Sequence, residues 1–265
     1  MYQIVFSDID GTLIQSDFQV GLRTKTAIRR VVDQGKIFVP VSARMPRAIQ
    51  PIVDSLGISC PIISYNGALI QDETGEVLFS QGMDIGQVRA ICRFIEEQHE
   101  AIAWNVYSYD RWYAQIRPSE WVDREEAIVQ VDAERVELAA LEQLELAHKV
   151  LLMGSPLLIP ALEVSLKEEY PELSIAQSAP YFIEIMAAGI EKGRAVANFA
   201  ACKGVDLANT MAFGDNYNDI EMLKTVGLGV VMGNAPDDIR SQFDCVTADH
   251  NHDGIALILE GVDEV

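Results

Sequence analysis

Residues 3–12 constrain the fold of this chain more than any other segment. Residues 3–7 read QIVFS, and residues 8–12 continue as DIDGT. An apolar run that ends in a charged turn with a glycine is typical of a buried parallel strand that delivers its last residues to the carboxyl edge of a sheet. Ligands of open α/β sheets bind along that edge. The segment therefore predicts a parallel α/β sheet with a polar site at its edge.

Two carboxylates stand together at the end of this predicted strand. Asp8 and Asp10 are two residues apart, so their side chains can point the same way, and Gly11 allows a tight turn beside them. Carboxylates this close repel each other and usually sit with a cation that offsets their charge. The alternative is a plain acidic turn, because Asp-Gly pairs are common in turns. The rest of the chain favours the first interpretation.

The composition indicates a globular protein with an acidic surface. The chain has 265 residues, 49% of them hydrophobic, which is enough for one large or two modest domains. Lys and Arg number 20 against 40 Asp and Glu, a net charge of −20. Such a balance argues against a broad basic face for nucleic acid or an anionic membrane. It does not exclude a small phosphorylated ligand, which a few local cations can hold.

The cysteines and the apolar segments indicate a soluble cytoplasmic protein. Cys60, Cys92, Cys202 and Cys245 are far apart and form no CxxC pair, so free thiols of a reducing compartment are expected. The amino terminus lacks a basic leader and is interrupted by acidic residues, which predicts no signal peptide. The longest apolar stretch, 150–162, contains glycine and proline and is shorter than the roughly 20 residues of a membrane helix.

Strands and helices alternate at both ends of the chain. The first half predicts helices at 26–32 and 46–56, strands at 36–41 and 62–64, and a hairpin through 77–79. The last part predicts helices at 192–203, up to 226 and at 254–259, with strands at 210–213 and 228–231. This order predicts a doubly wound, Rossmann-like parallel sheet.

Between these parts the order of elements changes. Aromatic-rich strands at 102–107 and 111–116 precede a strand at 150–153, a helix at 158–169 and strands at 173–177 and 181–186. Hairpins without strict strand-helix alternation predict an inserted α+β module. We place this module at residues 84–188, between the two parts of the sheet domain, residues 1–83 and 189–265. The aromatic residues of the module favour a hydrophobic core over a substrate cage; they are Trp104, Tyr107, Trp112 and Tyr113.

Four polar clusters follow predicted strands or begin a predicted helix. They are Asp8 with Asp10, Ser42 with Arg44, Lys192, and Asp215 with Asn218 and Asp219. Carboxylates, a hydroxyl and a lysine are the groups that bind and transfer a phosphoryl group. The usual nucleotide-binding loops, GxxxxGK[ST] and GxGxxG, are absent from the sequence. Taken singly, Lys192 and Ser42 could be ordinary surface or strand-end residues, and Arg44 and Arg47 could be surface charges.

In this order and spacing, the clusters resemble the motifs of the haloacid dehalogenase superfamily, in particular its phosphatases of the Cof type. The first motif reads DIDGT, the second SAR, the third is the lysine of EKG, and the fourth reads GDNYND. The supporting stretches NGA at 66–68 and MGNA at 232–235 are also present. The resemblance covers essentially the whole chain and places a cap between the second and third motifs. It implies that residues 84–188 are a cap domain and that residues 1–83 and 189–265 are the catalytic core.

The resemblance implies a role for each matching residue. Asp8 would be the nucleophile that forms an aspartyl-phosphate, and Asp10 the general acid and then the base. Mg²⁺ would be held by Asp8, by the backbone carbonyl of Asp10 and by Asp215, with Asp219 in support. Lys192 would act with the catalytic aspartates on the phosphoryl oxygens. The substrate-binding residues would be Thr12, Ser42, Ala43, Arg44 and Asn218.

One position departs from the family pattern. The family often has glycine after the hydroxyl of the second motif, where this chain has Ala43. A methyl group is tolerated there if φ is negative, although it could narrow the approach of the phosphate.

The resemblance implies Mg²⁺-dependent hydrolysis of a small phosphate monoester. The expected partner is therefore a small phosphorylated metabolite, with no nucleic acid, no membrane and no obligate protein partner. A sugar phosphate is the leading substrate class, followed by pyridoxal phosphate or flavin mononucleotide. A phosphomutase shares the core and both aspartates and is the first alternative. A phospho-acceptor regulatory module is the second, but it needs neither Asp10 as a proton donor nor a large cap. His250 and His252 have the look of metal ligands, but we do not expect a transition-metal site there.

Overall fold

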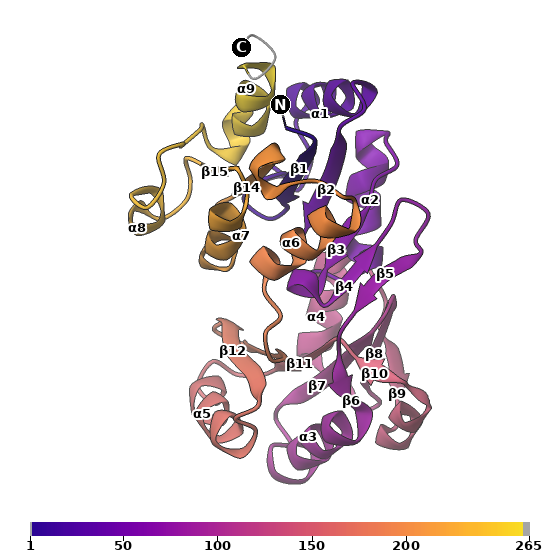
Figure 1. Cartoon of the computed structure of the whole chain (residues 1–265). Helices are drawn as coiled ribbons and strands as arrows, with labels where there is room; N and C mark the ends of the chain where they lie inside the picture. The colour runs from indigo at the N-terminus through magenta and orange to yellow at the C-terminus, as the bar shows by residue number, and fades with distance from the viewer. Residues whose placement is uncertain (1, 262–265) are drawn as a thin grey trace. The chain divides into compact units, whose positions relative to one another are not determined.

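The computed structural model describes residues 2–261, and the chain forms two compact units (Figure 1). The core unit consists of the described residues of Met1–Arg44, Ile49–Phe79 and Glu191–Val265, and the inserted unit of Met45–Ala48 and Ser80–Ile190. The assignment of these parts as catalytic core and cap stays a prediction. Residue 1 and residues 262–265 of the predicted core lie outside the described residues.

The core unit is built on a seven-stranded sheet in the order β15-β14-β1-β2-β3-β4-β5. The first five strands of this order pair in parallel, and β4 runs antiparallel to β3. The predicted parallel α/β sheet is thereby confirmed. The strands are β1 (Ile4–Asp8), β2 (Ile37–Val41), β3 (Ile62–Ser64), β4 (Leu69–Gln71), β5 (Val77–Ser80), β14 (Thr210–Gly214) and β15 (Leu228–Val231).

Helices cover both faces of this sheet because successive strand side chains point to opposite sides. Val5 packs in a buried cluster with α1, α2 and α9, whereas Ile4 and Phe6 pack with α6 and α7. Phe6 meets Phe199 of α6 edge to face, with ring centroids 6.0 Å apart. The helices of the core unit are α1 (Leu22–Asp33), α2 (Pro46–Leu56), α6 (Lys192–Cys202), α7 (Ile220–Thr225), α8 (Asp237–Arg240) and α9 (Gly254–Gly261), with 3₁₀ turns η1 (Tyr65–Gly67), η3 (Leu207–Asn209), η4 (Tyr217–Asp219) and η5 (His250–His252).

The inserted unit has its own sheet of six strands in the order β12-β13-β11-β7-β8-β9 and a short pair, β10-β6. Its strands are β6 (Met83–Asp84), β7 (Ala103–Ser108), β8 (Arg111–Gln115), β9 (Glu134–Val136), β10 (Leu146–Ala147), β11 (Lys149–Met153), β12 (Leu173–Ala179) and β13 (Phe182–Ala187). Its helices are α3 (Ile85–Gln98), α4 (Glu120–Val129) and α5 (Ile159–Glu169), with the 3₁₀ segment η2 (Leu138–Gln143). The mixed order is that of an α+β module.

The four aromatic residues that the sequence assigned to the core of this unit make two separate sets of contacts. Trp104 and Tyr113 belong to the hydrophobic cluster that α3 and α5 share with the sheet. Tyr107 and Trp112 stack on each other instead, with ring centroids 5.5 Å apart. Trp112 also donates a hydrogen bond from Nε1 to Oδ1 of Asn105, at 2.9 Å. The core interpretation is therefore confirmed for Trp104 and Tyr113.

Helix α4 is an element that the sequence did not predict. Its residues read EWVDREEAIV, and within it Val122 is the buried residue. With so little of its surface packed, the helix has no apolar stripe at helical spacing for the sequence to reveal.

The described residues bear on two expectations, which concern the cysteines and membrane-spanning helices. All four cysteines are free thiols, and burial raises the pKa of Cys60 to about 12. No helix within residues 2–261 is long and apolar enough to cross a membrane.

Candidate active site

Three strand ends of the core sheet bring predicted site residues to one edge. Asp8 is the last residue of β1, Ser42 follows β2, and Asp215 follows β14. Strand β1 lies between β2 and β14 and pairs in parallel with both. Because parallel neighbours end at the same edge, residues that are distant in the sequence meet there.

The loop after β1 turns at Gly11. Its φ of +81° is a left-handed conformation that glycine adopts without strain. A Cβ atom at this position would overlap the carboxylate of Asp215. The glycine of the DIDGT motif is therefore required both by the turn and by the close approach of the two loops.

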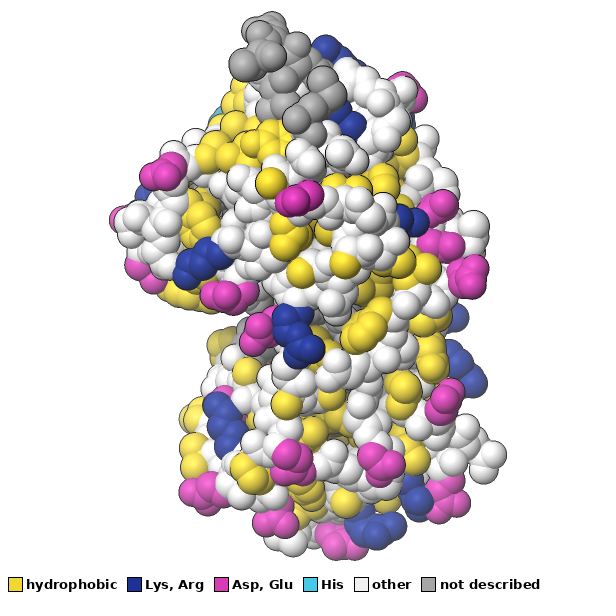
Figure 2. All heavy atoms as spheres, in the orientation of Figure 1, with side chains coloured by type: hydrophobic (Ala, Val, Ile, Leu, Met, Phe, Trp, Pro, Cys, Tyr) yellow, Lys and Arg dark blue, Asp and Glu magenta, His cyan; other side chains and the backbone are white. Residues whose placement is uncertain are grey.

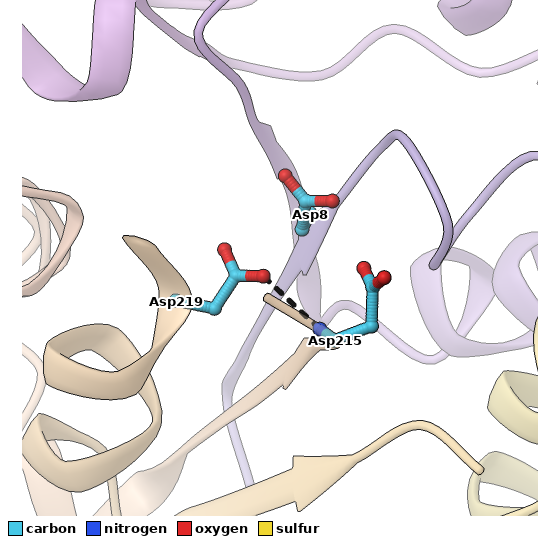
Figure 3. Close-up of side chains that lie close together, drawn as sticks. All are labelled: Asp8, Asp215 and Asp219. Atoms are coloured by element: carbon cyan, nitrogen blue, oxygen red, sulfur yellow. Dashed lines mark hydrogen bonds between the residues drawn. The ribbon is translucent and has the colours of Figure 1, made fainter. Parts of the chain in front are cut away.

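Asp8, Asp215 and Asp219 form a compact group of carboxylates (Figure 3). Their ligand oxygens lie within 4.8 Å of one another, and the three side chains point to the same side of the strand ends in Figure 3. Asp8 and Asp219 are buried and Asp215 is half-buried. Carboxylate oxygens are the ligands of hard cations such as Mg²⁺ and Ca²⁺. Within residues 2–261, this group is the one that could hold a metal ion.

Lys192 offsets part of the charge of this group. It is the first residue of α6, only 1% exposed, and its Nζ donates to Oδ1 of Asp8 and, at 2.6 Å, to Oδ1 of Asp219. Burial opposes the charged form of Lys192, yet the two carboxylates outweigh it and hold the pKa of Lys192 above its ordinary value. The two carboxylates thereby favour the ammonium form of this side chain.

One ammonium against three carboxylates still leaves an excess of negative charge. Burial raises the pKa of Asp8 well above its ordinary value, Lys192 opposes this rise, and Asp219 and Asp215 add to it. Burial likewise raises the pKa of Asp215, against a hydrogen bond from Thr12. A divalent cation would remove this repulsion, so the residues fit the metal that the sequence predicts.

Asp219 has its oxygens engaged by the protein. Oδ2 accepts a hydrogen bond from the backbone N–H of Asp215 at 3.0 Å (Figure 3). It also accepts one from the backbone N–H of Asn216 at 3.0 Å, and Oδ1 accepts from Lys192. These bonds fix the loop that carries Asp215. The arrangement suits a residue that supports the metal ligands and the lysine.

Thr12 joins the first motif to the fourth. The side chain is 2% exposed, and its hydroxyl donates to Oδ1 of Asp215 at 2.7 Å. The hydroxyl of Thr12 therefore orients the carboxylate of Asp215, whereas substrate binding by Thr12 stays a prediction.

Asp10 lies apart from the three carboxylates and pairs with Arg44. The guanidinium donates from Nε to Oδ2 of Asp10 at 2.9 Å and from Nη2 to Oδ1 at 2.5 Å. The side chain of Asp10 is 52% exposed, so solvent and a ligand can reach it. The structure thus pairs Asp10, the expected general acid and base, with Arg44, an expected substrate-binding residue.

The second motif forms the loop after β2. Ser42 is 1% exposed, and its Oγ accepts a hydrogen bond from the backbone N–H of Arg44 at 3.1 Å. Ala43 lies between them and is half-buried. Its backbone is not among the positive-φ positions, so the methyl group brings no strain.

Sequence reasoning gave no role to Asn66, which the structure places beside this loop. Its backbone N–H donates to the carbonyl of Ser42 at 2.8 Å, and its Oδ1 lies 3.4 Å from Nδ2 of Asn218. Tyr65 and Asn66 have φ values of +51° and +53°. Adjacent left-handed residues other than glycine are uncommon and occur where function requires them. The NGA stretch was the signal that could have identified it.

The loop that contains His250 and His252 makes contacts of its own. His252 Nδ1 lies 2.8 Å from each carboxylate oxygen of Asp249, and His250 Nε2 lies 3.2 Å from Oγ of Ser16. Both histidines therefore have partners in the loops around them.

The chain matches a known protein family over nearly its whole length. A model of the haloacid dehalogenase-like hydrolase family matches residues 5–259. The chain belongs to this family. A putative phosphatase of Haemophilus influenzae is 36% identical over 260 residues, which cover 98% of both chains. The HMP-PP phosphatase of Serratia proteamaculans is 29% identical over 242 residues, 91% of this chain and 87% of the relative.

Solved structures of similar proteins agree with this membership. A protein of Thermotoga maritima has a TM-score of 0.90 and 25% identity, and the match covers 98% of this chain and 97% of the other. A protein of Geobacillus kaustophilus has a TM-score of 0.88 and 27% identity over the full length of both chains. The predicted family, fold class and enzyme class of this haloacid dehalogenase-like hydrolase, a phosphoric monoester hydrolase, are therefore confirmed.

Proposed function

We propose that this hydrolase is a Mg²⁺-dependent phosphatase that cleaves a small phosphate monoester through an aspartyl-phosphate on Asp8. The observation that carries the proposal is the position of Asp8. It is a buried carboxylate at the end of β1, the middle one of the five parallel strands, in contact with the ammonium of Lys192 and grouped with Asp215 and Asp219. A fixed carboxylate beside a cation is suited to attack on phosphorus.

In the first half-reaction, an oxygen of Asp8 forms a bond to phosphorus while the bond to the ester oxygen breaks. Asp10 gives its proton to the departing alkoxide, which leaves as the alcohol. In the second half-reaction, Asp10 takes a proton from water, whose oxygen attacks phosphorus and releases phosphate and Asp8. The partly exposed Asp10, two residues from the nucleophile, is the group with access to both oxygens.

Asp8, Asp215 and the backbone carbonyl of Asp10 would hold Mg²⁺, which when bound offsets the charge of the phosphoryl oxygens. Asp219 keeps the loop of Asp215 in place through two backbone hydrogen bonds. Lys192 opposes the rise in the pKa of Asp8 that burial causes, and it presents its charge to the phosphoryl group. Ser42 and Asn218 would bind phosphoryl oxygens, with Asn66 orienting Asn218.

A sugar phosphate is the proposed substrate class, with pyridoxal phosphate and flavin mononucleotide next. Two relatives are named for small phosphorylated compounds, HMP-PP and 5-amino-6-(5-phospho-D-ribitylamino)uracil. They support a small metabolite over a macromolecule. A phosphomutase would use the same Asp8 but would return the phosphoryl group to a second hydroxyl of the sugar, so a product assay with a hexose phosphate separates the two activities.

The test is phosphate release from a panel of monoesters by wild type and Asp8→Asn, with Mg²⁺ and with EDTA. The amide has the volume of the carboxylate but cannot attack phosphorus, so we expect turnover to fall by roughly 10⁴-fold or more in a folded protein. Circular dichroism checks the fold. Full activity of the wild type in EDTA, or wild-type turnover in folded Asp8→Asn, would overturn the proposal.

A further inference from the structure

Asn234, in the loop after β15, contacts three segments that converge on the carboxylates. Its Nδ2 donates to the carbonyl oxygen of Gly11 at 2.9 Å and to Oδ2 of Asp215 at 3.1 Å. Its Oδ1 accepts the backbone N–H of His250 at 3.2 Å. One side chain thereby joins the loop of the nucleophile, the loop of the fourth motif and the segment before α9.

The three contacts fix which way the amide faces. Only the NH₂ group can donate to the two oxygens of Gly11 and Asp215, and only the carbonyl oxygen can accept from His250. A carboxylate at this position would set oxygen against oxygen at both acceptors. The contacts therefore require an amide, which is more specific than a requirement for any polar residue.

Asn234 completes the set of donors that hold Asp215. Thr12 donates to Oδ1 of that carboxylate at 2.7 Å, and Asn234 donates to Oδ2. With one donor on each oxygen, the carboxylate cannot rotate, and each oxygen keeps lone pairs for a cation. Groups that hydrogen-bond a ligating carboxylate in this way set its orientation and the affinity of the site.

We propose that Asn234 is a positioning residue that orients Asp215 for Mg²⁺ and ties it to the loop of Asp8. The inference rests on the proposed metal site. It goes beyond that site because it concerns an amide outside the group of carboxylates that could hold the ion. The contact with Gly11 is part of the role, since it sets the distance between the two loops that supply metal ligands.

The experiment is a calorimetric titration of the full chain with Mg²⁺. Asn234→Ala removes the donor on Oδ2 of Asp215, and we expect the Kd for Mg²⁺ to rise by about 10- to 100-fold. Asn234→Ser is a milder second variant with the same expectation, because its hydroxyl is too short to reach Asp215. Circular dichroism and the unfolding temperature without metal show whether each variant is folded.

Asn251→Ala is the matched control. Asn251 is an amide of the neighbouring 3₁₀ turn that bridges to the segment after the first motif, through the backbone N–H and the hydroxyl of Ser16, both at 3.0 Å. Its side-chain bonds go to Ser16 and not to the carboxylate group, so we expect the Kd for Mg²⁺ to stay within about twofold of wild type.

The outcomes separate this inference from the proposed function. If the wild type does not bind Mg²⁺, the proposed metal site fails and the inference fails with it. If Asp215→Asn weakens binding but folded Asn234→Ala and Asn234→Ser stay within twofold of wild type, only the role of Asn234 is overturned. Equal weakening by Asn251→Ala would also overturn it, since loop packing would then account for the effect.

Discussion

At the scale of single residues, Asp8 and Asp10 differ in surroundings although one residue separates them. Asp8 is buried against Lys192, whereas Asp10 is half exposed and bound by Arg44 through two hydrogen bonds. A nucleophile gains from a fixed position, and a group that must gain and lose a proton gains from access to solvent. The two environments match the two proposed roles.

Asp10→Asn should slow turnover by about 10²- to 10⁴-fold, because an amide can neither protonate the leaving oxygen nor activate water. The loss should be largest for alkyl phosphates, whose leaving groups most need a proton. The measurement is kcat for an alkyl and an aryl phosphate with wild type and variant. Arg44→Lys is a useful companion, since it keeps the charge but not the paired hydrogen bonds. An equal effect of Asp10→Asn on both substrates would contradict proton donation by Asp10.

Some contacts of the site could be predicted from the sequence and others could not. Motif residues at strand ends were predictable, because parallel strands deliver their last residues to one edge. The pairing of Asp10 with Arg44 and the contacts of Asn234 were not, since they join loops distant in sequence and depend on side-chain geometry. Asn66 was visible as part of NGA, and Asn-Gly favours left-handed backbone, but its contact with Asn218 joins loops distant in sequence and was not predictable.

At the scale of elements, predictability followed burial. The strands of the core sheet are continuous apolar runs packed on both faces, so β1, β2 and β15 were located to within a residue or so. Helix α4 buries little and escaped prediction. Lys192, the lysine of the third motif, is the first residue of α6. Taken alone in the sequence it could be an ordinary surface lysine, but in the structure it is buried and pairs with Asp8 and Asp219.

His148, between β10 and β11, makes the stability of the inserted unit depend on pH. Its Nδ1 accepts the backbone N–H of Tyr109 at 3.0 Å, so Nε2 carries the proton and donates to Oγ of Ser80, also at 3.0 Å. Burial lowers the pKa of His148 from 6.5 to about 4. The unfolded chain therefore binds a proton between these values while the folded unit does not, and stability falls as the pH drops from about 6.5 towards 4.

Between pH 7.5 and pH 5, this effect should remove about 2 kcal/mol from the free energy of unfolding. His148→Asn keeps an acceptor near Tyr109 but does not titrate, so the loss between the two pH values should be smaller by that amount. Urea unfolding can be followed by tryptophan fluorescence, because all three tryptophans lie in the inserted unit. The same pH dependence in wild type and variant would show that His148 is protonated in the folded unit as easily as in the unfolded chain.

At the scale of the whole molecule, the choice of substrate needs a source outside the motifs. The motif residues can contact the phosphoryl group and a cation, so they treat one monoester much like another. Residues 84–188 hold 8 Lys and Arg against 19 Asp and Glu. On the face drawn in Figure 2, basic side chains are interspersed with acidic ones. The excess of acidic residues in 84–188 disfavours ligands with several negative charges.

We therefore expect hexose and pentose monophosphates to exceed nucleoside triphosphates and nucleic acid ends in kcat/KM. Their only strong charge is the phosphate, and their hydroxyl-rich body carries none for the acidic residues to repel. Replacing residues 80–190 with those of a relative should change the order of substrates but leave the Asp8 chemistry in place. The measurement is kcat/KM over one panel for both proteins, with Asp8→Asn in each as the inactive control. A panel led by nucleotides would contradict the electrostatic argument, and an unchanged order in the exchanged protein would place the choice of substrate in the core unit.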